Sequence, residues 1–250
     1  MRILVCNDDG IGAPGLRVLA AAATVLMPDV WVVAPERKWT AASHQLSFDR
    51  DLSLTKLAVR EYACSGAPAD CVVAAMTLLF GTGGRPDLVL SGINDQVNVG
   101  EDLAYSGTMA VAREGTFWGV PALALSADGP GSPVPRSAPA IGSLLGVLWE
   151  RRAEWWAEGC WLSLNLPAQL PAPFLQTTVG RDKIGGACEV IEATPERTVF
   201  RLGRGRPGSS TAGDERAAMA AGAVAIGRHC WVTESRLPDE TVEAWNRTLP

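Results

Sequence analysis

Two adjacent carboxylates, Asp8 and Asp9, directly follow a short apolar segment at the start of the chain. Residues 2–6 have the composition of a buried parallel strand, and the glycine-rich turn after Asp9 opens a helix. Side chains at the carboxyl end of a strand in an open α/β sheet face the crevice where ligands bind. Because neighbouring like charges repel, a bound divalent cation is the simplest way to make this pair favourable. The pair therefore predicts a metal site, and a solvated Asp-Asp-Gly turn is the alternative.

A second group of polar residues is predicted to reach the same crevice. Asn94 comes just after a strand expected at 87–90, and Thr40 lies in the polar loop after a strand expected at 30–34. Ser106-Gly107-Thr108 begins a predicted helix, where backbone N–H groups and two hydroxyls are suited to a phosphate. A simple N-cap role for Ser106 is the alternative.

The glycines at 10, 12 and 15 spell the G-x-G-x-x-G pattern of dinucleotide-binding proteins, and Glu36 stands near the position of a ribose-binding acid. In that pattern the first glycine follows the strand directly, so that the pyrophosphate can lie on the helix N-terminus. Here Asn7, Asp8 and Asp9 intervene and place two negative charges beside a negative ligand. The sequence therefore disfavours a dinucleotide site.

Composition limits the class of protein. The 250 residues are 47% hydrophobic and 20% charged, which is enough for a large core and argues against disorder. The net charge of −5 argues against binding of a nucleic-acid polymer. Cys6 and Cys71 lie in apolar patterns, which favours buried thiols over disulfides. With neither a leader pattern nor an apolar run of membrane-spanning length, we expect a cytoplasmic protein without a membrane partner.

The apolar periodicity alternates between strands and helices. Further strands are expected at 121–125 and 161–166, the latter as the last strand of the core, with a hairpin in 45–60. Helices are expected at 16–27, 68–80, 106–115 and 140–156, and a linker at 128–139. This alternation predicts right-handed βαβ crossovers and a mostly parallel sheet. From about Thr177, short alternating runs with glycine-rich turns indicate antiparallel β-structure.

Together these motifs resemble the SurE family of divalent-metal-dependent nucleotidases, and the resemblance covers most of the chain. The segments that carry it are Asn7-Asp8-Asp9-Gly10-Ile11-Gly12-Ala13-Pro14-Gly15, Val33-Ala34-Pro35-Glu36, Gly66-Ala67-Pro68-Ala69-Asp70-Cys71-Val72, Ser91-Gly92-Ile93-Asn94, Tyr105-Ser106-Gly107-Thr108 and Glu114-Gly115. Weaker similarity continues through Leu164-Asn165-Leu166-Pro167 and residues 214–226.

The resemblance implies a Rossmann-like three-layer α/β/α sandwich, with a mostly parallel sheet and a C-terminal antiparallel β extension. It implies a single domain over 1–250, with a core at 1–170 and a β-rich extension at 171–250 that joins subunits into a homodimer or homotetramer. The implied reaction is hydrolysis of a nucleoside monophosphate at its 5' or 3' phosphate, with one Mg²⁺ or Mn²⁺ per subunit. The implied metal ligands are Asp8, Asp9, Thr40 and Asn94, of which Asp8 and Asp9 are also the candidates for proton transfer. The implied phosphate-binding residues are Asn98, Ser106, Gly107 and Thr108.

The chain departs from the family pattern at two places. Trp39-Thr40-Ala41 stands where the family has Arg-Ser-Gly, and Gln96 where it has Gly. Threonine keeps the hydroxyl, so metal binding is expected to survive. Trp39 offers a flat apolar face, which predicts substrates with an aromatic moiety if it faces the crevice; packing against its own loop is the alternative. The neighbouring His44 is expected to contact substrate or to be an ordinary surface residue.

Three other functions stay open. One is a non-catalytic nucleotide-binding or scaffolding protein of the same fold, and another is a phosphatase for a non-standard aromatic phosphate. The third is a Rossmann-like metal deacetylase, which also carries paired aspartates at a first strand end. That class needs histidine ligands for zinc, and no histidine precedes Asp8-Asp9 in this chain.

Overall fold

The computed structural model describes residues 1–127, 138–181, 187–203, 210–231 and 240. A nine-stranded sheet has the strand order β3-β4-β2-β1-β5-β6-β7-β11-β8, and β9 and β10 form a separate two-stranded sheet. The strands are β1 (Ile3–Cys6), β2 (Val30–Pro35), β3 (Leu54–Ala58), β4 (Glu61–Cys64), β5 (Leu88–Asn94), β6 (Ala122–Ala127), β7 (Cys160–Leu166), β8 (Phe174–Gln176), β9 (Cys188–Ala193), β10 (Thr198–Leu202) and β11 (Val224–Cys230). The strands from β4 through β7 in this order run parallel, which confirms the predicted mostly parallel sheet.

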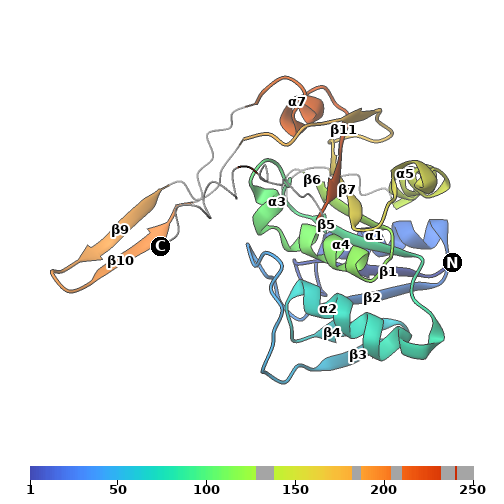
Figure 1. Cartoon of the computed structure of the whole chain (residues 1–250), viewed down its shortest axis with the longest axis horizontal. Helices are drawn as coiled ribbons and strands as arrows, with labels where there is room; N and C mark the ends of the chain where they lie inside the picture. Colours follow the sequence, from blue (N-terminus) through green and yellow to red (C-terminus); the bar gives the residue numbers. More distant parts are fainter. Residues whose placement is uncertain (128–137, 182–186, 204–209, 232–239, 241–250) are drawn as a thin grey trace.

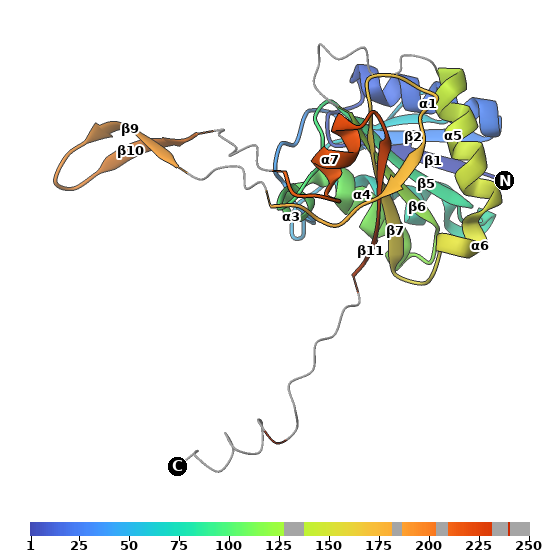
Figure 2. The ribbon, with the colours of Figure 1, turned by 90° about the horizontal axis from the view of Figure 1, so that it is seen from above.

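Helices cover both faces of the sheet. They are α1 (Pro14–Leu26), α2 (Pro68–Ala74), α3 (Asp102–Tyr105), α4 (Gly107–Phe117), α5 (Ala138–Glu150), α6 (Arg152–Trp155) and α7 (Glu215–Ala220). Figure 2 shows α1 and α5 side by side on one face, and α2 and α4 contact each other on the other face. The three-layer α/β/α prediction is therefore confirmed.

The alternation of side chains along β1 explains the two hydrophobic cores. Ile3 and Val5 pack into the cluster that contains the buried face of α1 and α5, whereas Leu4 and Cys6 pack with α2 and α4. Successive residues of a strand point to opposite faces, so a fully apolar strand is what a sheet covered on both sides requires. The expectation that Cys6 and Cys71 are buried thiols is confirmed.

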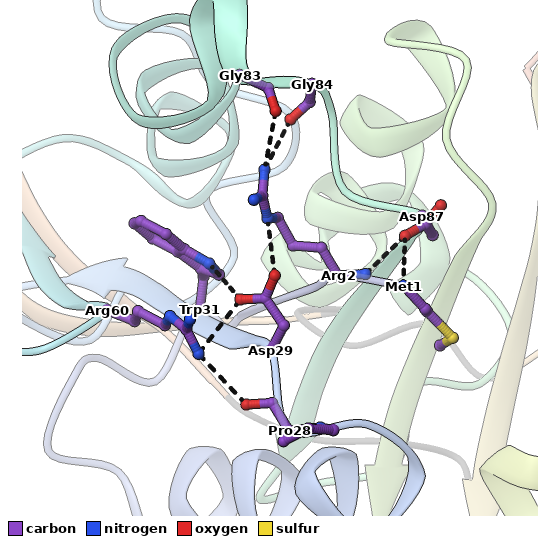
Figure 3. A network of polar contacts seen from close by, with 9 residues as sticks. All are labelled: Met1, Arg2, Pro28, Asp29, Trp31, Arg60, Gly83, Gly84 and Asp87. Carbon is purple, nitrogen blue, oxygen red and sulfur yellow. Dashed lines mark hydrogen bonds and ion pairs between the residues drawn. The ribbon is translucent and has the colours of Figure 1, made fainter.

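A polar network joins the amino ends of the central strands (Figure 3). The Asp29 carboxylate accepts hydrogen bonds from Arg2 Nε at 3.2 Å and Trp31 Nε1 at 3.0 Å, and it forms an ion pair with Arg60 at 3.3 Å. Asp87 Oδ2 accepts the Arg2 backbone N–H at 2.6 Å. These residues begin or precede β1, β2, β4 and β5, so the network holds the amino ends of these strands together. The carboxyl ends lie at the opposite edge of the sheet, where the site is expected.

Several predicted boundaries shift in the structure. The hairpin expected in 45–60 forms later, as β3 and β4, and residues 45–53 make no strand. The strand expected at 87–90 continues as β5 to Asn94. The helix expected over 68–80 ends in a π-helical segment, η1 (Ala75–Phe80), and the one over 140–156 is divided into α5 and α6. The linker expected at 128–139 lies mostly outside the described residues.

The prediction that residues 161–166 form the last core strand is wrong. β11 pairs antiparallel with β7 in the same sheet, and its Val224 is fully buried. A disulfide between Cys160 and Cys230 joins these two strands, and β8 then pairs parallel with β11. Antiparallel β-structure after Thr177 is confirmed in β9 and β10, which project away from the sheet as a hairpin (Figure 1). Among the helices of the described residues, none combines the length and the apolar character that a membrane span requires.

Candidate metal and phosphate site

The site begins with the loop that follows β1. Asn7 closes this loop, because its side chain accepts the Gly10 N–H at 3.2 Å and donates to the Gly10 carbonyl at 3.0 Å. The Asp8 carbonyl accepts the Trp39 N–H at 2.7 Å, which ties the loop to the segment after β2. The two loops that carry the predicted ligands are thus held together by their backbones.

Asp8 is a buried carboxylate, with 8% of its surface exposed. Its Oδ1 accepts a hydrogen bond of 2.6 Å from Thr108 Oγ1, at the start of α4. Burial raises the pKa of Asp8 to about 6; the Thr108 hydrogen bond opposes this shift and the neighbouring Asp9 charge adds to it. A carboxylate in this environment gains much from a positive charge placed beside it.

Gly107 allows α4 to approach Asp8. A Cβ at this position would lie 2.6 Å from the Asp8 Cβ, so any side chain here would force α4 or Asp8 to shift. Ser106 is the N-cap of α4, and its Oγ accepts the Met109 N–H at 3.1 Å. Ser106 also lines the pocket, whereas Gly107 and Thr108 are not among its described lining residues, and Thr108 bonds to Asp8. The Ser-Gly-Thr sequence therefore positions a carboxylate as well as presenting a hydroxyl.

Asp9 is held by charge. Lys38 Nζ lies 2.5 Å from Asp9 Oδ1 and 2.8 Å from Asp95 Oδ2, and the Asp95 N–H donates to Asp9 Oδ2 at 3.3 Å. Burial lowers the pKa of Lys38, but its hydrogen bonds to Asp9 and Asp95 outweigh this, so the net shift is upward. A cation already lies against one of the predicted metal ligands.

Thr40, Asn94 and Asn98 line a solvent-open pocket together with Asp8, Asp9 and Ser106. Asn94 donates its amide N–H to the Gln96 carbonyl at 2.7 Å, which leaves its amide oxygen as the group to offer a ligand. Asn98 is fixed from two strands, through Ser126 Oγ at 2.6 Å and the Asn165 side chain at 2.9 Å. The lining residues are Asp8, Asp9, Lys38, Thr40, Ala41, Asn94, Asp95, Gln96, Val97, Asn98, Asp102, Tyr105 and Ser106.

Trp39 and His44, both predicted near the site, are absent from the described lining of the pocket. The Arg37 guanidinium lies over the Trp39 ring, with its Cζ 4.3 Å from the ring centroid. The described lining of the pocket includes Lys38 and Thr40 but not Trp39. His44 bonds to Glu114 Oε2 at 2.8 Å and stacks on Phe117. The structure therefore favours packing over substrate contact for both residues. Among the described residues of the lining, Tyr105 is the aromatic one.

The donor set fits a hard divalent cation. Asp8, Asp9, Thr40 and Asn94 offer only oxygen atoms to one pocket, which suits Mg²⁺ or Mn²⁺ better than zinc. Within the described residues there is no cluster of three or more His, Cys, Asp or Glu arranged for a metal, so the two carboxylates need the neutral oxygens as partners. The ion pair between Lys38 and Asp9 shows that a positive charge is favourable at this position.

Sequence reasoning missed Lys38, Asp95 and the role of Thr108 toward Asp8. Lys38 stands two residues before Thr40 in a loop already assigned to the site, so its position was the available signal. No sequence pattern reports that Thr108 points at Asp8, because the two residues are 100 positions apart.

Comparison with known proteins identifies the family. The family model described as "Survival protein SurE" matches residues 3–185 of this chain. The chain is 39% identical over 206 residues to the 5'-nucleotidase SurE of Azorhizobium caulinodans, an alignment that covers 81% of this chain and 76% of that protein. The chain belongs to the SurE family.

Other SurE proteins match to different extents. The chain is 38% identical over 242 residues to a 5'-nucleotidase SurE of Rhodopseudomonas palustris, covering 90% of this chain and 92% of that protein. The match to the 5'-nucleotidase SurE of Paramagnetospirillum magneticum is higher, 52%, but spans 126 residues, or about half of each protein. The crystal structure of the SurE protein from Aquifex aeolicus superposes with a TM-score of 0.80 at 27% identity, covering 98% of this chain and 100% of that one.

Proposed function

We propose that this SurE protein is a divalent-metal-dependent 5'-nucleotidase that hydrolyses nucleoside monophosphates. The observation that carries the proposal is the buried Asp8 carboxylate at the end of β1, held by Thr108 and facing a pocket with Asp9, Thr40 and Asn94. Homology to 5'-nucleotidase SurE proteins over most of the chain supports the substrate class.

The proposed metal ligands are Asp8, Asp9, Thr40 and Asn94, with one Mg²⁺ or Mn²⁺ per subunit. When bound, such an ion polarises a phosphoryl oxygen and makes a coordinated water more acidic. In the metal-free protein burial raises the pKa of Asp8 to about 6, so its carboxylate can hold or release a proton near neutral pH. Ser106 and Asn98 line the same pocket and orient the phosphate through a hydroxyl and an amide. Gly107 and Thr108 contribute by positioning Asp8.

Two alternative functions would require different properties of this pocket. A non-catalytic nucleotide-binding protein requires the same pocket but releases no phosphate. A phosphatase for a non-standard aromatic phosphate requires an aromatic contact, and Tyr105 at the pocket supports that function better than Trp39 does. A deacetylase receives no support, since the described lining of the pocket contains no histidine.

We further propose that the β9–β10 hairpin, within the expected extension at 171–250, joins subunits as a homodimer or homotetramer. Support comes from four apolar side chains that the hairpin leaves more than half exposed, Val190, Ile191, Phe200 and Leu202. Such a concentration of exposed apolar groups is typical of interaction surfaces.

A panel assay tests the proposed activity. Phosphate release is measured from 5'- and 3'-nucleoside monophosphates, an aryl phosphate and a sugar phosphate, each with Mn²⁺, Mg²⁺ or EDTA. We expect metal-dependent release that is fastest from nucleotides. Nucleotide binding without release would support the non-catalytic alternative, and release from the aryl phosphate alone would support the aromatic-phosphate alternative.

A further inference from the structure

The pocket has an unusual balance of charge. Among its lining residues, as far as the structure describes the chain, there are four carboxylates, those of Asp8, Asp9, Asp95 and Asp102, and one cationic side chain, Lys38. A phosphate monoester carries about two negative charges near neutral pH, so the carboxylates repel it. Lys38 is the group of this described lining whose charge attracts the phosphate.

Lys38 also forms an ion pair with Asp9, one of the carboxylates proposed to bind the metal. Its Nζ lies 2.5 Å from Asp9 Oδ1, while Asp9 Oδ2 accepts the Asp95 N–H. A metal ion that takes Asp9 must displace this ammonium group, because both cations compete for the same oxygen and repel each other at such distances. Moving the Lys38 ammonium group off Asp9 requires little free energy, because the side chain is 47% exposed and still has Asp95 as a partner.

We propose that Lys38 is the internal counter-ion that a divalent metal displaces from Asp9 and that, once displaced, it contacts the phosphate of the substrate. This inference rests on the proposed function for its substrate class. A lysine suits the role because its ammonium group is a compact point charge with three donors on a flexible four-carbon stem. Asp95, itself 44% exposed, keeps the displaced ammonium group at the pocket.

The experiment uses K38M, which keeps the apolar stem and removes the charge. K38Q is a second neutral variant, and K56M is the matched control because Lys56 is an exposed lysine of β3 away from the pocket. Calorimetry measures the Kd of Mn²⁺ in the full-length protein without phosphate. The inhibition constant of inorganic phosphate is then measured at saturating Mn²⁺, and thermal unfolding checks each fold.

The proposal predicts shifts in opposite directions. We expect K38M and K38Q to bind Mn²⁺ severalfold more tightly than the wild type, because the internal competitor is gone, and to bind phosphate about tenfold more weakly. K56M should match the wild type in both. If Lys38 only stabilises the loop, its removal should weaken the binding of both Mn²⁺ and phosphate. That result, or an unchanged affinity for either one, would overturn the proposal.

The two proposals fail separately. If the wild type releases no phosphate from any substrate but Lys38 variants still shift both constants in opposite directions, the nucleotidase function fails and the role of Lys38 stands. If the wild type is an active nucleotidase and the Lys38 variants match it in both constants, the inference about Lys38 fails alone.

Discussion

At the scale of single residues, the site depends on the environment of Asp8. The carboxylate is removed from water, faces Asp9, and is held in one orientation by Thr108. Burial is the main reason that its pKa rises to about 6. Thr40 and Asn94 differ from it, because they contribute neutral oxygens whose value as ligands does not depend on pH. The proposed metal ligands are therefore of two kinds, charged carboxylates and neutral oxygens, and each kind is tested by its own substitutions.

The first prediction concerns the stability of the metal-free protein. The pKa of Asp8 is higher in the folded state, about 6, than the ordinary 3.8, so ionising it costs folding free energy. This cost is absent below pH 3.8, grows as the pH rises to 6 and is then complete, at up to about 3 kcal/mol. Asp8→Asn should remove this part of the pH dependence, so in EDTA the variant should be more stable than the wild type at pH 7. Urea unfolding at pH 4.5 and pH 7 measures it, and identical pH slopes for the two proteins would refute the assignment.

The second prediction separates a ligand from a packing residue at position 40. Thr40→Ser keeps the hydroxyl oxygen and should leave the Mn²⁺ affinity close to that of the wild type. Thr40→Val keeps the shape but offers no donor atom, so it should weaken Mn²⁺ binding on the order of tenfold. Calorimetric titration of both variants measures this. Normal Mn²⁺ binding by Thr40→Val would mean that Thr40 is no ligand.

At the scale of elements, the site is made by β1, β5 and the start of α4 meeting at one end of the sheet. Parallel strands bring their carboxyl ends to the same edge, so Asp8, Asp9 and Asn94 meet although they are distant in sequence. The polar network around Asp29 holds the opposite end of the same strands (Figure 3). The close approach of α4 at Gly107 completes the arrangement.

The third prediction tests that close approach. In Gly107→Ala the new Cβ would meet the Asp8 side chain, so α4 or Asp8 must shift. We expect kcat/KM to fall on the order of 10²-fold, as for other small displacements of reacting groups, while the protein stays folded. Gly146→Ala, in the middle of α5, is the control, because its Cβ would make only an ordinary contact with Leu26 Cδ1 at 4.0 Å. This variant should be as active and at least as stable as the wild type. Equal activity in Gly107→Ala and the wild type would show that the approach does not matter.

At the scale of the whole molecule, the sequence predicted the local features and missed those that depend on distant pairing. The α/β class, the helix that begins at Ser106 and the polar residues at the ends of β1 and β5 follow from periodicity and strand direction. The return of β11 to the sheet beside β7 does not, because an antiparallel pairing between residues so distant in sequence leaves no local pattern. The Cys160–Cys230 disulfide depends on the same pairing, with a separation of 70 residues. Side-chain directions, such as Trp39 under Arg37 and Lys38 on Asp9, are likewise set by tertiary contacts.

The fourth prediction concerns assembly through the β9–β10 hairpin. Val190 and Phe200 are opposite each other in the hairpin register and are 60% and 56% exposed. Replacing both with lysine places two charges on the proposed contact, so the oligomer should dissociate to monomers in light scattering after gel filtration. Val59→Lys, at a position 84% exposed in another part of the chain, should keep the mass of the wild type. An unchanged mass in the double variant, or a monomeric wild type, would contradict the proposal.

The most direct test of the account is the rate of phosphate release from a nucleoside 5'-monophosphate as a function of Mn²⁺ concentration, in the wild type and in Asp8→Asn. If the pocket holds a catalytic metal ion, the wild-type rate is negligible in EDTA and rises to saturation with Mn²⁺. Asp8→Asn, folded as judged by its thermal unfolding, should give no rise over the same range, because the charged ligand is gone. A wild-type rate independent of metal, or a wild-type saturation curve in Asp8→Asn, would contradict the account.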